Sequence, residues 1–407
     1  MKKLAVIGRG TVGCVSALQL KLNFPDAEVQ WHYDPSINPQ SVGEGTTLIL
    51  PRLLSDTINF SPRDYPKVDG YVKTGIFKDG WSSDGKSFLH DFPPPAVGLH
   101  FNAAKMQDYI YDRLKDHVNI FEQNITPEDI DADYIIDCSG KPNNFKNHTM
   151  SGFIPVNSVH VTQCFWEAPK FSHTLTIARP YGWVFGIPLQ NRCSIGYMYN
   201  SDINTLDEVK EDVKAIFRDY SLTPSNTTSS FAFKNYYKNK NFNERSCSNG
   251  NASFFLEPLE AMSFGMASNI LYGAMDYISG LRSLDDINSE YGRLIPNVES
   301  IIMMHYFAGS KYKTDFWDFA RERGEACMNY AKYSEHFCDM VKTAKPAKDF
   351  GTFPEDILLS GKASIDFIEL NNLWWAGSFS QNLDGLGIRQ NLKAILEINQ
   401  TQEIAAQ

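Results

Sequence analysis

Met1 to Gly13 read MKKLAVIGRGTVG, and the architecture of the chain follows from this stretch. The apolar run Lys3–Ile7 predicts a buried strand, and a glycine-rich turn follows it directly. Gly8, Gly10 and Gly13 form the pattern G-x-G-x-x-G. Its first glycine permits a tight turn, its second lets a pyrophosphate approach the backbone, and its third lets a helix pack closely on the strand. The stretch therefore predicts the start of a dinucleotide-binding βαβ unit.

A second strand completes this unit. Glu28 to Tyr33 predicts the strand, which ends at Asp34, 21 residues after Gly13. A carboxylate at this place accepts hydrogen bonds from the ribose of a bound dinucleotide. The alternative is a glycine-rich turn without a ligand, but the position of the turn between a strand and a helix favours cofactor binding.

Composition limits the class of protein. The chain has 407 residues, 43% hydrophobic and 13% aromatic, with a net charge of −10, which argues against a nucleic-acid surface. No apolar run reaches the roughly 18 residues of a membrane span, and the first apolar run is too short for a signal peptide. We therefore expect a cytoplasmic protein without a nucleic-acid or membrane partner. The seven scattered cysteines, without a C-x-x-C pair, predict reduced thiols and no metal site.

The first half of the chain alternates between expected loops and short regular elements. Gln40–Leu54 predicts a loop that enters a helix, and Asp79–Gly98, with three consecutive prolines, predicts a solvent-facing loop. Asn102 is expected to cap a helix. Asp133–Cys138 predicts another buried strand, and the Ser-Gly pair after it suits backbone contact with a cofactor.

The second half changes in pattern. Alternating segments from Val156 to Tyr199 predict antiparallel strands of a second sheet, and Thr205–Glu208 is a capping box that opens a helix. Gly250–Ala252 is a second glycine-containing turn, ahead of a helix expected over Ala261–Tyr277. Glu299–Gln407 is expected to be mainly helical. The chain therefore predicts a discontinuous α/β nucleotide module with an inserted sheet and a helical cap.

The number of nucleotide-binding glycine motifs helps to identify the cofactor. A nicotinamide dehydrogenase could begin with the same glycine turn, but the later turn at Gly250 favours a flavin, with Asn251 as the hydrogen-bonding residue. The chain has no second G-x-G-x-x-G, which argues against a separate module for NAD(P)H. A separate flavin reductase is therefore expected to deliver the reduced flavin.

A series of short motifs follows the glycine turn along most of the chain. They are the glycine box Gly8–Gly13, S-V-G-E-G-T at Ser41–Thr46, Lys73 eight residues before Trp81, D-C-S-G at Asp137–Gly140, G-W-V-F-G-I-P at Gly182–Pro188, G-Y-M-Y at Gly196–Tyr199, Gly250–Glu260, and the pairs His305-Tyr306 and Phe316-Trp317. In this order they resemble the motifs of flavin-dependent halogenases of the tryptophan-halogenase type.

The resemblance implies an α/β fold. It has a discontinuous Rossmann-type FAD-binding module of the flavin monooxygenase type, an inserted antiparallel sheet and a C-terminal helical substrate cap. We expect one compact unit, in which the FAD-binding module takes residues 1–60, 96–155 and 245–298. The substrate module takes residues 61–95, 156–244 and 299–407.

The resemblance also implies a reaction. Reduced FAD and O₂ oxidise a halide to hypohalous acid, and Lys73 orients this species for electrophilic halogenation of a small indole- or phenol-like aromatic substrate. Lys73 would act either as an ammonium that hydrogen-bonds the hypohalous acid or as a neutral amine that forms a haloamine. Glu260 would polarise the electrophile or take the proton from the halogenated intermediate. Trp183 and Phe185 would keep the substrate away from the flavin. The residues expected to bind the cofactor are Gly8, Gly10, Thr11, Val12, Gly13, Asp34, Gly43, Glu44, Gly45, Gly250 and Asn251.

Three departures from the family pattern shape these expectations. Phe185 stands where the family has a second tryptophan, which keeps the bulk but loses the indole N–H. The halide is expected near the backbone amides of Met262 and Ser263, where Ala261 lacks a family hydroxyl, so a roomier pocket would favour bromide or iodide over chloride. The chain is also shorter than tryptophan halogenases, which fits a short, viral-type member and puts tryptophan in doubt as the substrate.

Other functions stay open at this stage. The same scaffold could serve an FAD-dependent aromatic hydroxylase or a catalytically silent flavin-binding protein. Without the resemblance, Lys73 would be taken as a solvated surface lysine and Glu260 as an ordinary carboxylate at a helix N-terminus. Association into a homo-oligomer is left open as well.

Overall fold

The computed structural model describes the chain except for residues 38–42, 47, 93–96, 345, 348–375 and 396–407. The chain divides into two compact units. The first consists of Met1–Tyr71, Gly98–Ser151 and Lys234–Arg293, and the second of Val72–Val97, Gly152–Phe233 and Leu294–Gln407. The module ranges expected from the sequence stay a prediction.

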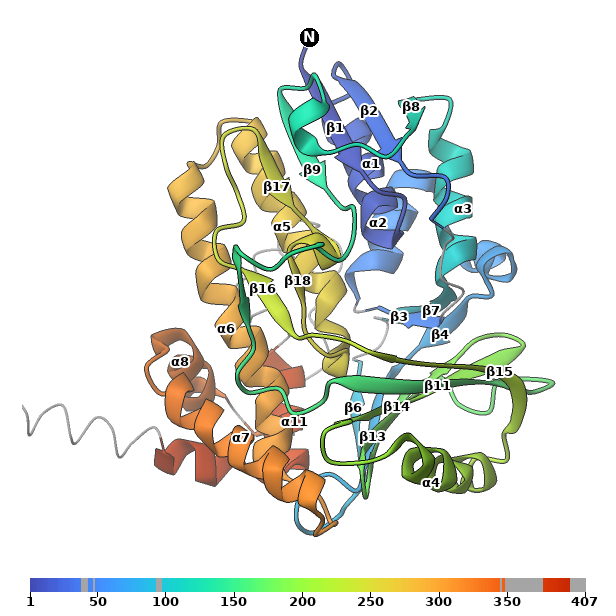
Figure 1. Cartoon of the computed structure of the whole chain (residues 1–407), viewed down its shortest axis with the longest axis vertical. Coiled ribbons are helices and arrows are strands. Elements are labelled where there is room, and N and C mark those ends of the chain that lie inside the picture. Colours follow the sequence, from blue (N-terminus) through green and yellow to red (C-terminus); the bar gives the residue numbers. More distant parts are fainter. Residues whose placement is uncertain (38–42, 47, 93–96, 345, 348–375, 396–407) are drawn as a thin grey trace, which may run out of the picture. The chain divides into compact units, whose positions relative to one another are not determined.

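A five-stranded parallel sheet forms the centre of the first unit (Figure 1). Both strands expected at the start of the chain are confirmed, and they pair in parallel from Lys3 with Glu28 to Ile7 with His32. The order of the sheet is β17 (Ser246–Ser248), β9 (Tyr134–Asp137), β1 (Lys3–Ile7), β2 (Glu28–Tyr33) and β8 (Asn119–Glu122). Because the paired strands run parallel, their carboxyl ends lie along one edge, where ligands bind in sheets of this type.

Helix α1 (Thr11–Asn23) begins directly after the glycine turn and is buried along most of its length. It packs against α3 (Ala103–Leu114) and α5 (Met262–Ile278), which explains why it lacks a polar face. The cap expected for α3 is confirmed, because the Asn102 side chain accepts a hydrogen bond from the backbone N–H of Lys105. These contacts hold the start of α1 firmly against the sheet.

Two expectations for the first unit were wrong in detail. Gly43–Gly45 is not a loop but the short strand β3, which pairs antiparallel with β7 (Gly98–Asn102) because its small residues allow close backbone pairing. The turn at Gly250 does not lead directly into a helix, since β18 (Phe254–Phe255) intervenes before α5. The remaining elements are α2 (Ile49–Ile58), η1 (Pro62–Val68), η2 (Pro127–Asp129), β10 (His148–Met150), β16 (Tyr236–Lys238), η3 (Gly250–Ala252) and η4 (Leu259–Ala261).

A seven-stranded sheet forms the centre of the second unit. The antiparallel strands expected between Val156 and Tyr199 are confirmed, and only the pair of β12 and β5 is parallel. The order is β15 (Thr223–Ala232), β11 (Ser158–Phe165), β14 (Arg192–Tyr199), β13 (Gly182–Pro188), β12 (Thr174–Arg179), β5 (Gly75–Asp79) and β6 (Phe88–Asp91).

The expectation of a solvent-facing loop over Asp79–Gly98 holds for residues 83–87, which are irregular and mostly exposed, but was wrong for residues 88–92. Phe88–Asp91 is strand β6, which pairs antiparallel with β5, and both His90 and Phe92 are buried. The aromatic residues Phe88, His90 and Phe92 recur with a period of two, which is the strand pattern, but the neighbouring prolines masked it. Pro93, Pro94 and Pro95 lie outside the described residues.

The C-terminal region is helical where the structure describes it, as expected. It contains α7 (Asp315–Ala331), α8 (Glu335–Thr343) and α11 (Ala376–Gly385). Earlier in the unit, the capping box of α4 (Leu206–Asp219) is confirmed by reciprocal hydrogen bonds between Thr205 and Glu208. Two elements, β4 (Tyr71–Lys73) and α6 (Leu284–Ala308), include residues of both units.

Within the described part of the chain, no helix is long and apolar enough to cross a membrane. The same residues contain no group of histidine, cysteine and carboxylate side chains that could hold a metal ion. All seven cysteines are free, and burial raises the pKa of each thiol.

Candidate active site

The three glycines of the first turn have different surroundings. A Cβ atom on Gly8 would lie 2.2 Å from the carbonyl oxygen of Cys138, and one on Gly13 would lie 2.3 Å from the carbonyl oxygen of Gly8. These two glycines therefore permit close packing. Around Gly10, in contrast, no atom lies within 4 Å of an added Cβ. This open backbone is the place where a pyrophosphate can approach.

The start of α1 provides hydrogen-bond donors at the same place. The backbone N–H groups of Thr11, Val12 and Gly13 belong to the first turn, which has no intrahelical acceptors for them, whereas Cys14 N–H already bonds the carbonyl of Gly10. No acidic residue lies in this turn to repel an anion. An open glycine and a helix N-terminus together fit the pyrophosphate of a dinucleotide such as FAD.

The segment Gly43–Gly45 meets this turn through a side-chain hydrogen bond. The Thr11 hydroxyl donates to the Glu44 carboxylate at 2.9 Å. Pairing with β7 fixes the backbone of Glu44. The Thr46 N–H donates to the Leu99 carbonyl, and the Thr46 hydroxyl accepts from the Leu99 N–H. The structure therefore places two separate groups of expected cofactor residues side by side.

Burial raises the pKa of Glu44, and the hydrogen bond from Thr11 offsets this only in part. The folded state thus favours the neutral carboxyl. At pH values above the ordinary pKa of a glutamate, the ionised Glu44 carboxylate therefore destabilises the folded protein. We expect Glu44→Gln to raise the melting temperature at about pH 7, and we expect the gain to shrink near pH 4, where the carboxyl is protonated in both states. Thermal unfolding at several pH values measures this.

Glu208→Gln is the matched control for that experiment. Hydrogen bonds from Thr205 hold the pKa of Glu208 below its usual range, so the same substitution should lower stability at about pH 7. A loss of stability at neutral pH in both variants would contradict the interpretation of Glu44.

The turn at Gly250 lies against α1. Gly250 has a φ of +57°, and an added Cβ would lie 3.3 Å from the Val12 side chain. The Asn249 N–H bonds the carbonyl of Asp137, which ties this turn to the end of β9. The Asn251 side chain is exposed, so it is accessible to a ligand. Gly250 is thus next to the first glycine turn, as a shared ligand would require.

Asp34 lies at the carboxyl end of β2, where the sequence places it. Its carboxylate accepts hydrogen bonds from the Ser36 hydroxyl at 2.6 Å and from the Ser36 N–H at 2.8 Å. These two bonds lower the pKa of Asp34, so the group is an ionised acceptor at neutral pH. A role on a ribose stays a prediction.

The chain has an unusual backbone immediately before α5. Glu260 and Ala261 both have left-handed conformations, with φ of 68° and 54°. Such conformations cost of order 1–3 kcal/mol for each non-glycine residue and persist where the surroundings fix them, often at functional sites. The Glu260 side chain is buried, and the next residues, Met262 and Ser263, begin α5 with N–H groups that have no intrahelical acceptor.

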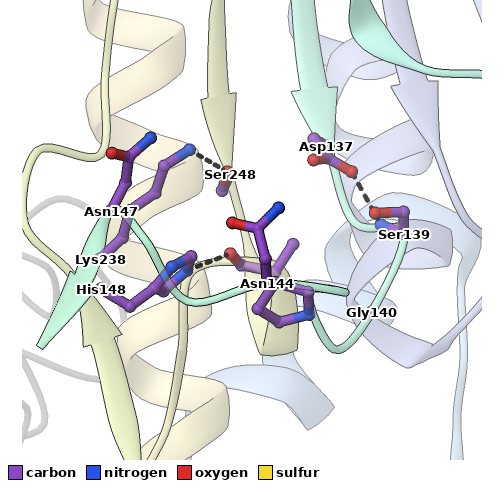
Figure 2. A pocket seen from close by; sticks show the side chains of 10 residues that line it. Asp137, Ser139, Gly140, Asn144, Asn147, His148, Lys238 and Ser248 are labelled. Carbon is purple, nitrogen blue, oxygen red and sulfur yellow. Dashed lines mark hydrogen bonds between the residues drawn. The ribbon is translucent and has the colours of Figure 1, made fainter. Parts of the chain in front are cut away.

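A small polar cavity of about 180 Å³ lies at the carboxyl ends of β9 and β17 (Figure 2). Lys238 donates to the Ser248 hydroxyl at 2.7 Å, and His148 lies 3.4 Å from the carbonyl of Ala252. Burial lowers the pKa of His148 and favours its neutral form. Of its lining, the sequence indicated the D-C-S-G segment and the turn that ends at Ala252. The lining residues are Asp137, Ser139, Gly140, Pro142, Asn144, Asn147, His148, Lys238, Ser248 and Ala252.

Lys73, in the second unit, is buried with 1% of its surface exposed. Its Nζ lies 5.4 Å from the centre of the Phe92 ring, within the range of a cation–π interaction. Lysines are rarely buried to this extent, and a desolvated ammonium beside an aromatic ring is a reactive setting. The structure therefore excludes the solvated surface lysine that the sequence alone would suggest.

Trp81 lies at the centre of a buried aromatic cluster. Its Nε1 donates to the carbonyl of Thr176 at 3.1 Å, and its ring contacts His305 at 5.8 Å between centroids. Its ring also contacts Trp183, Tyr306 and Trp317. This cluster fixes the strands and helices of the second unit around one apolar centre.

Trp183 and Phe185 differ in exposure. Trp183 is buried, whereas Phe185 is half-buried, and their rings lie 6.2 Å apart. A Cβ on Gly196 would lie 2.0 Å from the Phe185 ring, so the glycine of the G-Y-M-Y strand makes room for that ring. Only Phe185 thus has a surface available to a ligand in addition to its packing role.

Three buried polar residues of the second unit were not expected from the sequence. Lys78 is 0% exposed and lies 5.5 Å from the centre of the Phe88 ring. His90 and Asn382 are also buried, although they are far apart in the chain. The period-two pattern of β6 could have identified His90, but no local signal identifies Asn382.

Comparison with known proteins finds a matching family and related proteins. The family model for tryptophan halogenase matches residues 3–126 and 95–392. Tryptophan 7-halogenase RebH of Lentzea aerocolonigenes is 25% identical over 353 residues, which cover 81% of this chain and 62% of that protein. Tryptophan 6-halogenase ThaL of Streptomyces albogriseolus is 25% identical over 285 residues, which cover 64% of this chain and 49% of that protein. The chain thus spans about half to three fifths of the length of these relatives.

Solved structures share the fold. A tryptophan halogenase from Shewanella frigidimarina superposes with a TM-score of 0.72 at 18% identity, covering 100% of this chain and 95% of that one. BrvH, a flavin-dependent halogenase from Brevundimonas, superposes with a TM-score of 0.69 at 17% identity, covering 98% and 96%. Since the family model matches far more than half of the sequence, the chain belongs to the tryptophan halogenase family.

Proposed function

We propose that the protein is a flavin-dependent halogenase that acts on a small aromatic compound. In the overall reaction an aromatic C–H, a halide ion, a proton, O₂ and reduced FAD give the aromatic C–halogen product, FAD and two molecules of water. Family membership supports this assignment. The single observation that carries it within the structure is the buried Lys73 ammonium beside the Phe92 ring.

The first unit is proposed to hold FAD. The open backbone at Gly10 and the N–H groups at the start of α1 would bind the pyrophosphate, while Asp34 would accept hydrogen bonds from the ribose. Gly250 and Glu44 would complete the site. Reduced FAD, when bound, would give two electrons to O₂, and the oxygen would take two more from the halide, which becomes hypohalous acid. A separate reductase supplies the reduced flavin, because the chain has only one nucleotide fingerprint.

Lys73 is proposed to orient the hypohalous acid. Its ammonium donates a hydrogen bond to the oxygen of this species, which strengthens the positive character of the halogen. As the aromatic carbon forms a bond to the halogen, the halogen–oxygen bond breaks, and the departing hydroxide takes a proton from the Lys73 ammonium and leaves as water. The proton that the ring loses restores the ammonium. Because Lys73 is buried, water does not compete for this hydrogen bond.

Glu260 is proposed to take the proton that the halogenated ring must lose. A buried carboxylate is a suitable base, and the left-handed backbone of Glu260 and Ala261 fixes its direction. Phe185, which is half-buried, is proposed to separate the substrate from the flavin. Trp183 would support Phe185 by packing, since it is buried.

The start of α5 is proposed as the halide site. Backbone N–H groups at Met262 and Ser263 can bind an anion, and Ala261 leaves more room than a residue with a hydroxyl. We therefore propose that bromide or iodide is used in preference to chloride.

The test is a reconstituted reaction with FAD, a flavin reductase, NADH, O₂ and equal concentrations of chloride and bromide. A panel of indoles and phenols is offered, and products are identified by mass. The proposal requires halogenated products with bromide dominant. Mainly chlorinated product would contradict the preference for bromide but not the halogenase function. Hydroxylated product would indicate an aromatic hydroxylase, and flavin binding without any product would indicate a silent flavoprotein.

A further inference from the structure

Three polar side chains from different elements meet in the interior of the second unit. Asn382 of α11 is 0% exposed, and its Nδ2 lies 3.3 Å from Nδ1 of His90 in β6. Its Oδ1 lies 3.3 Å from Nε2 of His305 in α6. We refer to Asn382, His90 and His305 as the buried bridge.

Further hydrogen bonds fix the orientation of this bridge. Asn382 Nδ2 also donates to the carbonyl of Ser378 at 3.0 Å, so the amide nitrogen faces His90 and the amide oxygen faces His305. The other ring nitrogen of His305 lies 3.0 Å from the carbonyl of Ile301. A buried amide is costly unless it is hydrogen-bonded, so these contacts favour one orientation of the Asn382 side chain.

The neighbour of Asn382 also holds β6. In the order of the described sheet β6 is an edge strand, so the outward backbone groups of Asp91 require partners other than a strand. Gln381 Oε1 accepts from the Asp91 N–H at 2.8 Å, and Gln381 Nε2 donates to the Asp91 carbonyl at 3.4 Å. Helix α11 thus contacts both the backbone of β6, through Gln381, and the His90 side chain, through Asn382.

A chain of contacts links β6 to Lys73. His90 and Phe92 lie two residues apart on one face, with ring centres at 5.7 Å. The Phe92 N–H bonds the carbonyl of Thr74, the residue after Lys73, and the Phe92 ring lies 5.4 Å from Lys73 Nζ. A shift of His90 would therefore move the ring against which the ammonium rests.

The opposite end of the bridge is anchored. His305 contacts the Trp81 ring edge-to-face at 5.8 Å, and the Trp81 indole is itself hydrogen-bonded to the carbonyl of Thr176. Both rings are buried. The bridge therefore connects the buried aromatic cluster to β6, so that β6 takes its position from a rigid part of the unit.

We propose that Asn382 is a positioning residue that sets the place of Lys73 through His90 and Phe92. The consequence for catalysis rests on the proposed halogenase function. With the bridge intact, the halogen species bound at Lys73 is delivered to the substrate; without it, the ammonium and the Phe92 ring lose their alignment and the species is released unused.

The test compares Asn382→Leu with Asn297→Leu. Both asparagines are buried in the second unit, but Asn297 on α6 accepts a hydrogen bond from the Ser334 hydroxyl, whereas Asn382 contacts His90 of β6. The first readout is coupling, the amount of halogenated product formed per reduced flavin oxidised. We expect Asn382→Leu to lower coupling at least about tenfold, since misplacement of a reacting group by about 1 Å can cost 10²-fold. Flavin affinity should stay within about twofold.

The second readout does not require activity. Lysine acylation followed by peptide mass spectrometry measures how accessible Lys73 is in each variant. We expect Lys73 to be protected in the unaltered protein and in Asn297→Leu, and to react at least about tenfold faster in Asn382→Leu. If the unaltered protein makes no halogenated product while Lys73 still becomes reactive in Asn382→Leu, the halogenase function fails but the positioning role stands.

Equal coupling and equal Lys73 acylation in Asn382→Leu and Asn297→Leu would overturn the proposal. Should Asn382→Leu fail to fold, Gln381→Leu takes its place, because it removes the hydrogen bonds to the Asp91 backbone and leaves the buried amide in place. The same two readouts then apply, with the same expected direction and the same contradicting result.

Discussion

Lys73→Met is expected to abolish halogenation while flavin binding is retained. Methionine keeps an unbranched side chain of similar length in the buried site but has no N–H to orient hypohalous acid. We expect the rate of product formation to fall at least about 10³-fold, the range found when a group that stabilises the transition state is removed. The measurement is product by mass with saturating reduced FAD, together with flavin affinity by fluorescence.

Lys78→Met is the matched control for this prediction. Lys78 is also a fully buried lysine of the second unit beside an aromatic ring, Phe88. If burial of a lysine were important only for stability, both variants would lose activity in proportion to their loss of stability. We expect Lys78→Met to keep most of its activity at temperatures where it is folded. Halogenation at the unaltered rate in Lys73→Met would remove Lys73 from the mechanism.

Gly10→Val is expected to prevent FAD binding without unfolding the protein. The backbone of Gly10, with φ of −67° and ψ of 172°, suits any residue, and no atom lies within 4 Å of an added Cβ. The valine side chain would instead occupy the space in which the pyrophosphate approaches α1. We expect the Kd for FAD to rise at least about 100-fold, or about 2.7 kcal/mol. Titration with FAD and thermal unfolding measure the two quantities.

Two other glycines provide the controls. Gly152→Val also places its Cβ in open space, but it lies in the second unit, so FAD affinity should be unchanged. Gly8→Ala should lose stability rather than affinity alone, because its Cβ would meet the Cys138 carbonyl at 2.2 Å and its φ is +100°. An unchanged FAD affinity in Gly10→Val would contradict the assignment of this turn as the pyrophosphate site.

The glycine turn illustrates what a local sequence pattern can predict. A strand, three spaced glycines and a helix follow one another within a short stretch, so their roles are set by neighbouring residues, and the structure confirms both strands and the helix. Even the different roles of Gly8 and Gly10 follow from the pattern. The capping residues Asn102 and Thr205 are local signals of the same kind, and both are confirmed.

Features that depend on contacts between distant segments were not predictable in this way. Asn382 lies 292 residues from His90, and nothing in the sequence around either residue indicates that they meet. The burial of Lys73 likewise depends on β6, which the neighbouring prolines concealed. The left-handed backbone at Glu260 and Ala261 runs against local preference, because residues with a Cβ rarely adopt it unless tertiary contacts impose it.

Halogen transfer inside the protein at Lys73 is the central step of the proposed reaction. A reaction with FAD, reductase, NADH, O₂, bromide and an aromatic substrate is run with increasing amounts of a thioether that scavenges free hypohalous acid in solution. If transfer takes place at Lys73, the unaltered protein should form the same amount of brominated product at every thioether concentration. Product that falls in proportion to added thioether would show that the halogen reacts in solution, and would contradict transfer at the buried lysine.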